Sequence, residues 1–151
     1  MTPSAFATQL AALVPRLRRL AAVLVRPGED GDALVLAVLQ RALGQAASWH
    51  AGGRLDLWLF RILAQLWLER RGAGPAGERQ PPEPVDVATR QAVALLPERQ
   101  RLVVALVLVE GLRYQQAAAV LDVAPALVAD ELARARQALH AALPDHARSV
   151  P

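Results

Sequence analysis

The residues of this chain that could support catalysis or bind a metal are too scattered to form a site. His50, His140 and His146 stand alone, with no second ligand at the spacing that a metal site needs. Asp130 and Glu131 are adjacent, so on a helix they would point about 100° apart and make a poor acid–base pair. There is no cysteine and no glycine-rich phosphate loop. The sequence therefore predicts no enzyme activity, no cofactor, no metal site and no small-molecule substrate.

The most informative segment, 96–143, has the pattern of a three-helix unit that ends in a helix-turn-helix. Pro97 suits a first helical turn, where no amide hydrogen is needed. Residues 102–109 are apolar on all sides, as expected of a helix buried by its neighbours. Gly111 can take the left-handed conformation that ends such a helix. A helix-turn-helix binds DNA and has no chemistry of its own, so this segment favours a role in transcription.

The two remaining helices of this unit are expected at 114–121 and from Pro125 onward, where apolar residues recur at helical spacing. The connector between them has only three residues, which is the length of a helix-turn-helix turn. Its first residue, Asp122, adopts the left-handed conformation more readily than most non-glycine residues. A generic helical hairpin is the alternative interpretation of the same pattern.

Charge is distributed unevenly between the two halves of the chain. All 17 basic residues are arginine. Up to Arg71 there are nine arginines against five acids, a net charge of +4, whereas the remainder has eight against nine, a net charge of −1. A DNA-binding module normally carries positive charge that neutralises phosphates. The half with the helix-turn-helix lacks this charge, so we expect DNA affinity to reside mostly in the first half.

The segment 71–84 is rich in glycine, proline and charge and has almost nothing to bury, so it is predicted to be a linker. We therefore expect a first domain at 1–71, a linker at 72–85, a helix-turn-helix domain at 86–147 and a frayed tail at 148–151. No apolar run reaches the roughly 18 residues that a membrane span requires. This absence predicts no membrane insertion, and the lack of cysteine fits a reducing cytoplasm.

The first domain shows three helical patterns and no strand-like alternation, which predicts an all-α fold of two small helical domains. The first pattern should kink or divide at Pro15. The second starts near Asp32, and the third covers about 55–70. The residues expected to face the core are Phe6, Leu10, Leu13, Leu17, Leu20 and Leu24 in the first helix, Leu34, Val35, Val38, Leu39, Ala42 and Leu43 in the second, and Leu55, Trp58, Leu59, Ile62, Leu63 and Leu66 in the third.

Two helical domains in this order, the second a helix-turn-helix, resemble the extracytoplasmic-function (ECF) class of bacterial RNA polymerase sigma factors, within the sigma-70 family. In the first domain the resemblance is carried by GDALVLAVLQRAL (31–43) and by WLFRILAQLWLERR (58–71), which is similar to the promoter-melting helix of that class. In the second it is carried by residues 94–123 and by LARARQAL (132–139). The resemblance covers nearly the whole chain.

This resemblance implies that the chain binds core RNA polymerase and promoter DNA, and that an anti-sigma factor is a further partner. The first domain would bind the polymerase clamp and the melted minus-ten strand, and the last helix would enter the major groove at the minus-thirty-five element. Aromatic and arginine side chains suit extruded bases. The region 2 residues expected at DNA are Trp49, Arg54, Phe60, Arg61, Trp67 and Arg70. Packing of the aromatic rings against the other helices is the alternative interpretation.

The expected contact surfaces depart from the pattern of the class. At the start of its recognition helix the class usually has arginines, whereas this chain has alanine, leucine and acids, which predicts weak DNA binding there. The recognition-helix residues are Ala126, Leu127, Ala129, Asp130, Arg134 and Arg136. The face expected to meet polymerase or an anti-sigma factor comprises Asp32, Leu36, Ala37, Gln40 and Arg41. It lacks the acids and Gln-Glu groups that the class commonly shows.

Polar contact groups are thus few while both hydrophobic cores remain, and two functions fit this combination. The first is an ECF sigma factor that directs transcription initiation. The second is a sigma-like regulator that sequesters an anti-sigma factor without binding DNA itself. A sigma factor with an unusual promoter preference is a weaker third possibility.

Overall fold

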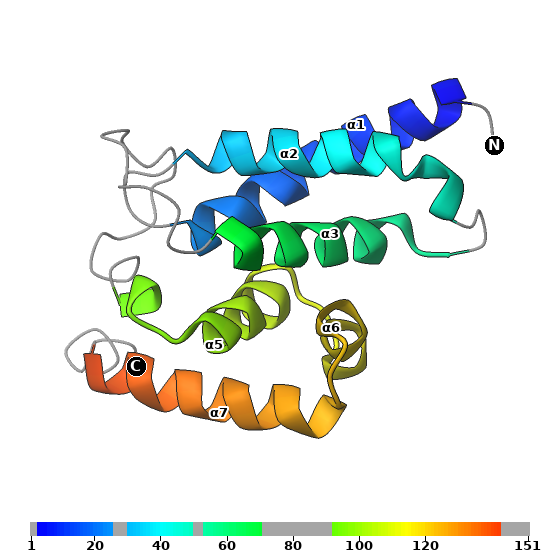
Figure 1. Ribbon diagram of the computed structural model, residues 1–151. Coiled ribbons are helices and arrows are strands. Elements are labelled where there is room, and N and C mark those ends of the chain that lie inside the picture. The colour runs from blue at the N-terminus through cyan, green and yellow to red at the C-terminus, as the bar shows by residue number, and fades with distance from the viewer. Residues whose placement is uncertain (1–2, 26–29, 50–52, 71–91, 143–151) are drawn as a thin grey trace.

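The structure, a computed structural model, describes residues 3–25, 30–49, 53–70 and 92–142. Every regular element within these ranges is a helix, as the hydrophobic periodicity predicts (Figure 1). The expected linker at 72–85 and the expected tail at 148–151 lie outside the described residues.

The first domain consists of helices α1 (Pro3–Leu24), α2 (Gly31–Gly44) and α3 (Leu55–Arg70), with a short 3-10 turn η1 (Ala46–Ser48) after α2. Each of the three long helices packs on the other two. The predicted apolar stripe of α1 faces the core, with only Leu13 partly exposed. Pro15 does not divide this helix, because α1 runs through it as one element.

Helix α2 begins at a side-chain cap, as local capping rules predict, but fewer of its residues are buried than expected. The carboxylate of Asp30 caps the helix by accepting from the backbone N–H of Asp32 at 2.9 Å. Four of the six residues expected in the core are fully buried. Leu43 is instead 56% exposed and does not join the buried cluster.

The second domain consists of α5 (Glu98–Val103), η2 (Val104–Val109), α6 (Tyr114–Leu121) and α7 (Pro125–Ala142). The central apolar helix changes partway from α to π hydrogen bonding, so that the N–H of Glu110 donates to the carbonyl oxygen of Ala105, five residues earlier, at 3.0 Å. Residues 102–106 are buried as predicted, whereas Leu108 is 46% exposed. The π segment ends at Val109, directly before Glu110.

Both turns of the helix-turn-helix have the backbone geometry that their residues predict. Asp122, the first residue of the connector, has φ 57° and ψ 49°, in the left-handed region. Gly111, which ends the central helix, has φ 73°. Left-handed backbone costs least at glycine and is tolerated at aspartate, which explains both residue types.

The two domains pack against each other along α3 and α6 and along α1 and η2. In Figure 1 the α1–α3 layer lies on α5 and α6, and α7 lies on the side of the second domain away from the first. The buried apolar residues of both domains form one continuous cluster. The composition of residues 71–84 indicated a boundary between two domains, but it gave no indication of this close packing.

Candidate functional site

Helix α7, the expected recognition helix, is an outer helix that packs on α5 and α6 through one face. Its buried residues are Val128, Glu131, Leu132 and Ala135. Four of the six residues expected at DNA are exposed: Ala126, Asp130, Arg134 and Arg136. The other two, Leu127 and Ala129, are half-buried. A free helix surface of this kind has the shape to enter a major groove.

The charges on α7 largely cancel one another. Arg134 lies 3.4 Å from the carboxylate of Asp130 and 3.7 Å from that of Glu131, one turn back along the helix. Both acids therefore compete with any phosphate for this guanidinium. Arg136 has neither acid as a partner among the ion pairs of the described residues. The exposed face of α7 thus offers little net positive charge to DNA.

The outer face of α2 carries an apolar stripe. Leu36 and Leu43, two turns apart, are both 56% exposed, and the exposed side chain of Gln40 lies between them. Ala37 is half-buried beside this stripe. Leu36 and Leu43 are the two large apolar side chains that α2 leaves exposed.

The two charged residues expected on this face are each engaged in an ion pair. Asp32 accepts from the guanidinium of Arg18 on α1 at 3.1 Å, with both side chains more than half exposed. Arg41 lies 2.9 Å from the carboxylate of Glu69 on α3. Exposed pairs of this kind are worth about 0–1 kcal/mol, so a partner can break them at low cost.

Phe60 and Trp67 do not project into solvent as the promoter-melting role requires. Phe60 is 1% exposed and Trp67 is 8% exposed, and both belong to the hydrophobic core. The indole N–H of Trp67 donates to the carbonyl oxygen of Leu24 at 3.1 Å. Packing, the alternative interpretation of these rings, therefore describes their state in this structure.

Each of these two rings is covered by an arginine that also contacts the other domain. The guanidinium carbon of Arg16 lies 5.0 Å from the ring centre of Phe60, and that of Arg101 lies 5.3 Å from the ring centre of Trp67. Arg16 belongs to α1 and pairs with Glu110 in the second domain. Arg101 belongs to α5 and donates to Leu24 in the first. Only the contact of Arg101 with Trp67 joins the two domains, because Arg16 and Phe60 both belong to the first.

The remaining region 2 residues differ in accessibility. The Arg54 side chain is 57% exposed, and Arg61 is exposed on α3. Trp49 is half-buried against Phe6, with ring centres 5.6 Å apart. The Trp49 indole N–H is buried and finds no hydrogen-bond partner among the described residues. Arg70 ends α3, and the position of its side chain lies outside the described part of the chain.

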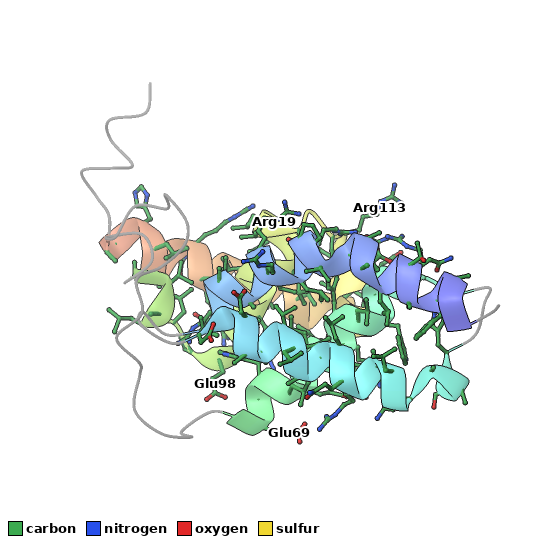
Figure 2. All side chains as sticks on the ribbon, turned by 90° about the horizontal axis from the view of Figure 1, so that it is seen from above. Arg19, Glu69, Glu98 and Arg113 are labelled. Atoms are coloured by element: carbon green, nitrogen blue, oxygen red, sulfur yellow. The ribbon has the colours of Figure 1, made fainter. Side chains whose placement is uncertain are left out.

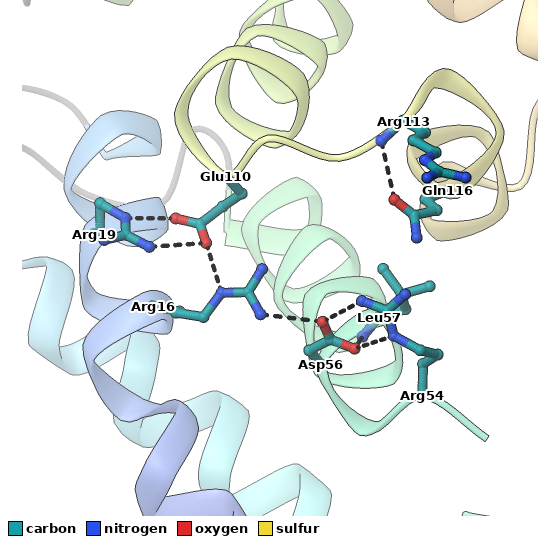
Figure 3. A network of polar contacts seen from close by, with 8 residues as sticks. All are labelled: Arg16, Arg19, Arg54, Asp56, Leu57, Glu110, Arg113 and Gln116. Carbon is teal, nitrogen blue, oxygen red and sulfur yellow. Dashed lines mark hydrogen bonds and ion pairs between the residues drawn. The ribbon is translucent and has the colours of Figure 1, made fainter. Parts of the chain in front are cut away.

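A chain of ion pairs connects α1, α3 and the second domain (Figure 3). Glu110, whose side chain is 0% exposed, accepts from Arg19 at 2.8 Å and from Arg16 at 3.0 Å. Arg16 also donates to Asp56 at 3.0 Å, and Asp56 accepts from Arg54 at 2.7 Å. Three arginines thus surround two buried carboxylates, which leaves this face with excess positive charge.

The same contacts shift the pKa values of the groups involved. Burial alone would raise the pKa of the Asp56 carboxyl, but hydrogen bonds from Arg54 and Arg16 outweigh it and hold that pKa below its usual value. The hydrogen bond and charge of Glu110 raise the pKa of Arg19, and those of Asp56 raise the pKa of Arg54. Asp56 is therefore ionised at neutral pH and binds both arginines as a carboxylate.

Figure 2 shows that Arg19 and Arg113 project from one side of the molecule and that Glu69 and Glu98 lie on the opposite side. Arg113 is exposed just before α6. Arg19 and Arg113, one from each domain, therefore lie on the same side of the molecule. The net charges of the two sequence halves could not reveal this arrangement, because it arises when one domain packs on the other.

Sequence reasoning missed the residues that join the domains. Arg16, Arg19 and Glu110 were not expected to interact, since 94 residues separate Arg16 from Glu110. Arg101 offered one usable signal in the sequence, because it directly precedes the apolar run 102–109. In the structure this arginine is 9% exposed. A charged residue next to a buried helix face indicates either a cap or a buried pair.

Neither a metal site nor a membrane span is visible in the described ranges. No cluster of three or more potential metal-ligating histidine or acidic residues occurs there. No helix among the described residues is long and apolar enough to cross a membrane.

Comparison with known families assigns both domains. The family model described as "Sigma2 domain of PhyR" matches residues 10–64. The model described as "Sigma-70, region 4" matches residues 86–139. A curated relative, the ECF RNA polymerase sigma factor EcfG of Rhodopseudomonas palustris (strain TIE-1), is 33% identical over 147 residues, covering 87% of this chain and 81% of that protein. The chain therefore belongs to the ECF sigma factors of the sigma-70 family, which are regulatory proteins.

Two solved structures share the fold over most of their length. The sigma factor RpoE from Bartonella quintana, in complex with the anti-sigma factor NepR, is 26% identical and superimposes with a TM-score of 0.78, covering 92% of this chain and 96% of that one. CnrH in complex with the cytosolic domain of CnrY is 25% identical, with a TM-score of 0.74 and coverage of 95% and 90%. In each of these two structures the chain that resembles this one is bound to a second protein.

Proposed function

We propose that this chain acts as an ECF sigma factor that binds core RNA polymerase and promoter DNA and is held by an anti-sigma factor. Membership of the family supports the general role. The observation that carries the partner-binding part is the exposed apolar stripe on α2. Leu36 and Leu43 remain uncovered in a chain that buries most other large apolar side chains. We propose that this stripe meets polymerase or an anti-sigma factor, flanked by Asp32, Ala37, Gln40 and Arg41.

We further propose that DNA affinity resides mainly in the first domain. Arg61 is exposed there, and that half of the sequence has a net charge of +4. On α7, by contrast, Asp130 and Glu131 surround Arg134. Affinity that comes from phosphate contacts depends on uncompensated cations, so the recognition helix would add little.

The test is a pull-down with the full-length variant Leu36→Asp. A carboxylate in a buried apolar contact is costly, so partner capture should fall at least about tenfold while the helical circular dichroism spectrum is unchanged. Leu95→Asp is the matched control, because Leu95 is an even more exposed leucine, at 84%, in the second domain. The partners scored are purified core polymerase and the anti-sigma proteins of the host. Full retention of both by Leu36→Asp would move the contact to another face.

A second candidate function is a sigma-like decoy that captures an anti-sigma factor without binding DNA. The near-neutral exposed face of α7 favours it, as does the burial of Phe60 and Trp67. Transcription reconstituted with core polymerase discriminates the two functions. A sigma factor supports initiation from a cognate promoter, whereas a decoy only restores the activity of another sigma factor inhibited by the shared anti-sigma protein.

A further inference from the structure

Phe6, near the start of α1, contacts two aromatic rings that stand on either side of the connection between α2 and α3. Its ring centre lies 5.6 Å from that of Trp49, which directly follows the short turn η1. It lies 6.2 Å from the ring centre of Trp58, which belongs to the first turn of α3. In Figure 1 the start of α1 and the turn after α2 lie at the same end of the first domain. One side chain of α1 therefore packs against residues of two other elements.

The three aromatic residues expected at melted DNA differ in burial. Phe60 is 1% exposed and Trp67 is 8% exposed, so neither ring is available for stacking while the core is intact. Trp49 is half-buried and packs at the edge of the core. Unpaired bases stack on aromatic rings that they can reach. Trp49 is therefore the best placed of these three rings to contact an extruded base.

Packing, and not a hydrogen bond, orients the indole of Trp49. Its N–H is buried and has no hydrogen-bond partner among the described residues. Most buried indole N–H groups have a partner that helps to fix the ring, as Trp67 does by donating to the carbonyl oxygen of Leu24. The position of the Trp49 ring therefore depends on the apolar side chains around it, and Phe6 is the aromatic one that the described residues supply.

Phe6 is well suited to hold another ring, because its own surroundings are fixed. It is 6% exposed and is the first member of the apolar stripe of α1. Its other aromatic neighbour, Trp58, is held by the first turn of α3, where the Trp58 amide donates to the carbonyl oxygen of Arg54 at 3.2 Å. Phe6 thus connects Trp49 to two helices at once.

We propose that Phe6 is a positioning residue for DNA capture, and that it holds the Trp49 ring in the orientation in which this ring stacks on an extruded base. A binding group must be kept in place by neighbours that are themselves locked by packing, and a small displacement forfeits much of the contact. Substitution of Phe6 should therefore weaken one base contact from a distance. This effect on DNA rests on the proposed function, whereas the restraint of Trp49 by Phe6 does not.

The restraint is measured first, without DNA. Full-length protein labelled with 5-fluorotryptophan gives one fluorine signal for each of its 3 tryptophans, assigned by replacing each in turn with phenylalanine. Phe6→Leu keeps an apolar side chain and removes the ring. We expect the Trp49 signal to broaden by about twofold or more, or to split, because the released indole samples several orientations, while the Trp67 signal keeps its width. Loss of the Phe6 ring current by itself would shift a signal without broadening it.

The effect on DNA is measured by scanning an abasic site along a single strand. The probe is the single-stranded DNA sequence that the parent protein enriches from a randomised pool. In the parent, removal of one particular base should lower affinity by about fivefold or more, as expected for a lost stack. In Phe6→Leu this loss should shrink to about twofold or less, while the losses at all other positions stay the same. A purely structural role would lower affinity equally for every probe.

Two further variants serve as controls. Phe6→Tyr keeps the ring, so both the Trp49 signal and the loss at the critical base should match the parent. Leu17→Val trims a fully buried side chain on the same helix, about three turns away, and should change neither readout. This variant shows what destabilisation of α1 does by itself.

A single narrow Trp49 signal in Phe6→Leu would overturn the proposal. So would an equal loss at the critical base in Phe6→Leu and in the parent. If the parent shows no critical base at all, the proposed capture of DNA by the first domain fails, and the DNA role of Phe6 fails with it. The fluorine spectra would still decide whether Phe6 restrains Trp49.

Discussion

The guanidinium carbon of Arg101 lies 5.3 Å from the ring centre of Trp67, and both side chains donate to the carbonyl oxygen of Leu24. An arginine of the helix-turn-helix domain thereby stabilises an aromatic ring and a helix end of the first domain. A cation–aromatic contact of this kind contributes about 2 kcal/mol when it is desolvated. The closed arrangement of the two domains is therefore specified by polar contacts in addition to apolar burial.

Replacing Phe60 by alanine should destabilise the fold, whereas replacing its neighbour Arg61 by alanine should not. Phe60 is 1% exposed, and emptying such a site costs about 3–5 kcal/mol. Arg61 is exposed, so its loss should change stability by about 0.5 kcal/mol or less. Urea unfolding of both variants checks this. Unchanged stability of Phe60→Ala would show that the ring is not part of the core in solution.

Asp56→Asn should destabilise the protein at neutral pH and much less in acid. The folded pKa of Asp56 is lowered, so its stabilising contribution is complete above the ordinary pKa of about 3.9 and is lost as pH falls through the folded value. Two arginines then lose a charged partner, at a cost of about 1–3 kcal/mol near pH 7.

The measurement is the free energy of unfolding of wild type and of Asp56→Asn at pH 7 and near pH 3. The difference between the two proteins should shrink at the lower pH. Asp32→Asn serves as control, because its exposed pair with Arg18 is worth at most about 1 kcal/mol at either pH. An equally large difference for Asp56→Asn at both pH values would mean that its ionisation is not coupled to folding.

The turn of the helix-turn-helix should respond to substitutions at Asp122 according to backbone conformation. Asp122→Gly should raise stability by several tenths of a kcal/mol, since glycine adopts φ 57° without steric cost. Asp122→Val should lower stability by about 1–2 kcal/mol, because a β-branched residue is strained in the left-handed region. Thermal unfolding of the two variants gives both values. The opposite order would contradict the assigned turn geometry.

Adding cations to the exposed face of α7 should strengthen DNA binding. The double variant Ala126→Arg with Asp130→Arg places arginines one turn apart and releases Arg134 from one of its acids. Each new phosphate contact should steepen the slope of log affinity against log salt by about 0.9. Glu131 is left unchanged because it is buried.

Fluorescence anisotropy with a duplex at several salt concentrations provides the measurement. Gln9→Arg adds one charge, against three for the double variant, on the exposed surface of α1, and shows how much the slope changes for each charge added outside α7. A double variant whose slope equals that of Gln9→Arg would show that α7 does not face DNA.

The sequence by itself determined the helices, the turn residues and the family. Apolar residues at helical spacing defined the core faces of α1, α2 and α3 except at Leu43, and Asp122 and Gly111 mark the two left-handed turns, with φ angles of 57° and 73°. These features depend on neighbours within one or two turns, so local sequence encodes them. The sequence motifs, taken in order, identified the sigma class correctly.

Only the tertiary structure decided which charges are paired and which rings are covered. Phe60 and Trp67 have the same residue types whether they meet DNA or the core. In the folded chain both rings belong to the core, and each also lies beside a guanidinium, of Arg16 or of Arg101, that contacts both domains. Glu110 meets Arg16 across 94 residues of sequence, because the two domains pack against each other along α1 and η2. Interactions between residues so far apart in the chain have no signature in local periodicity.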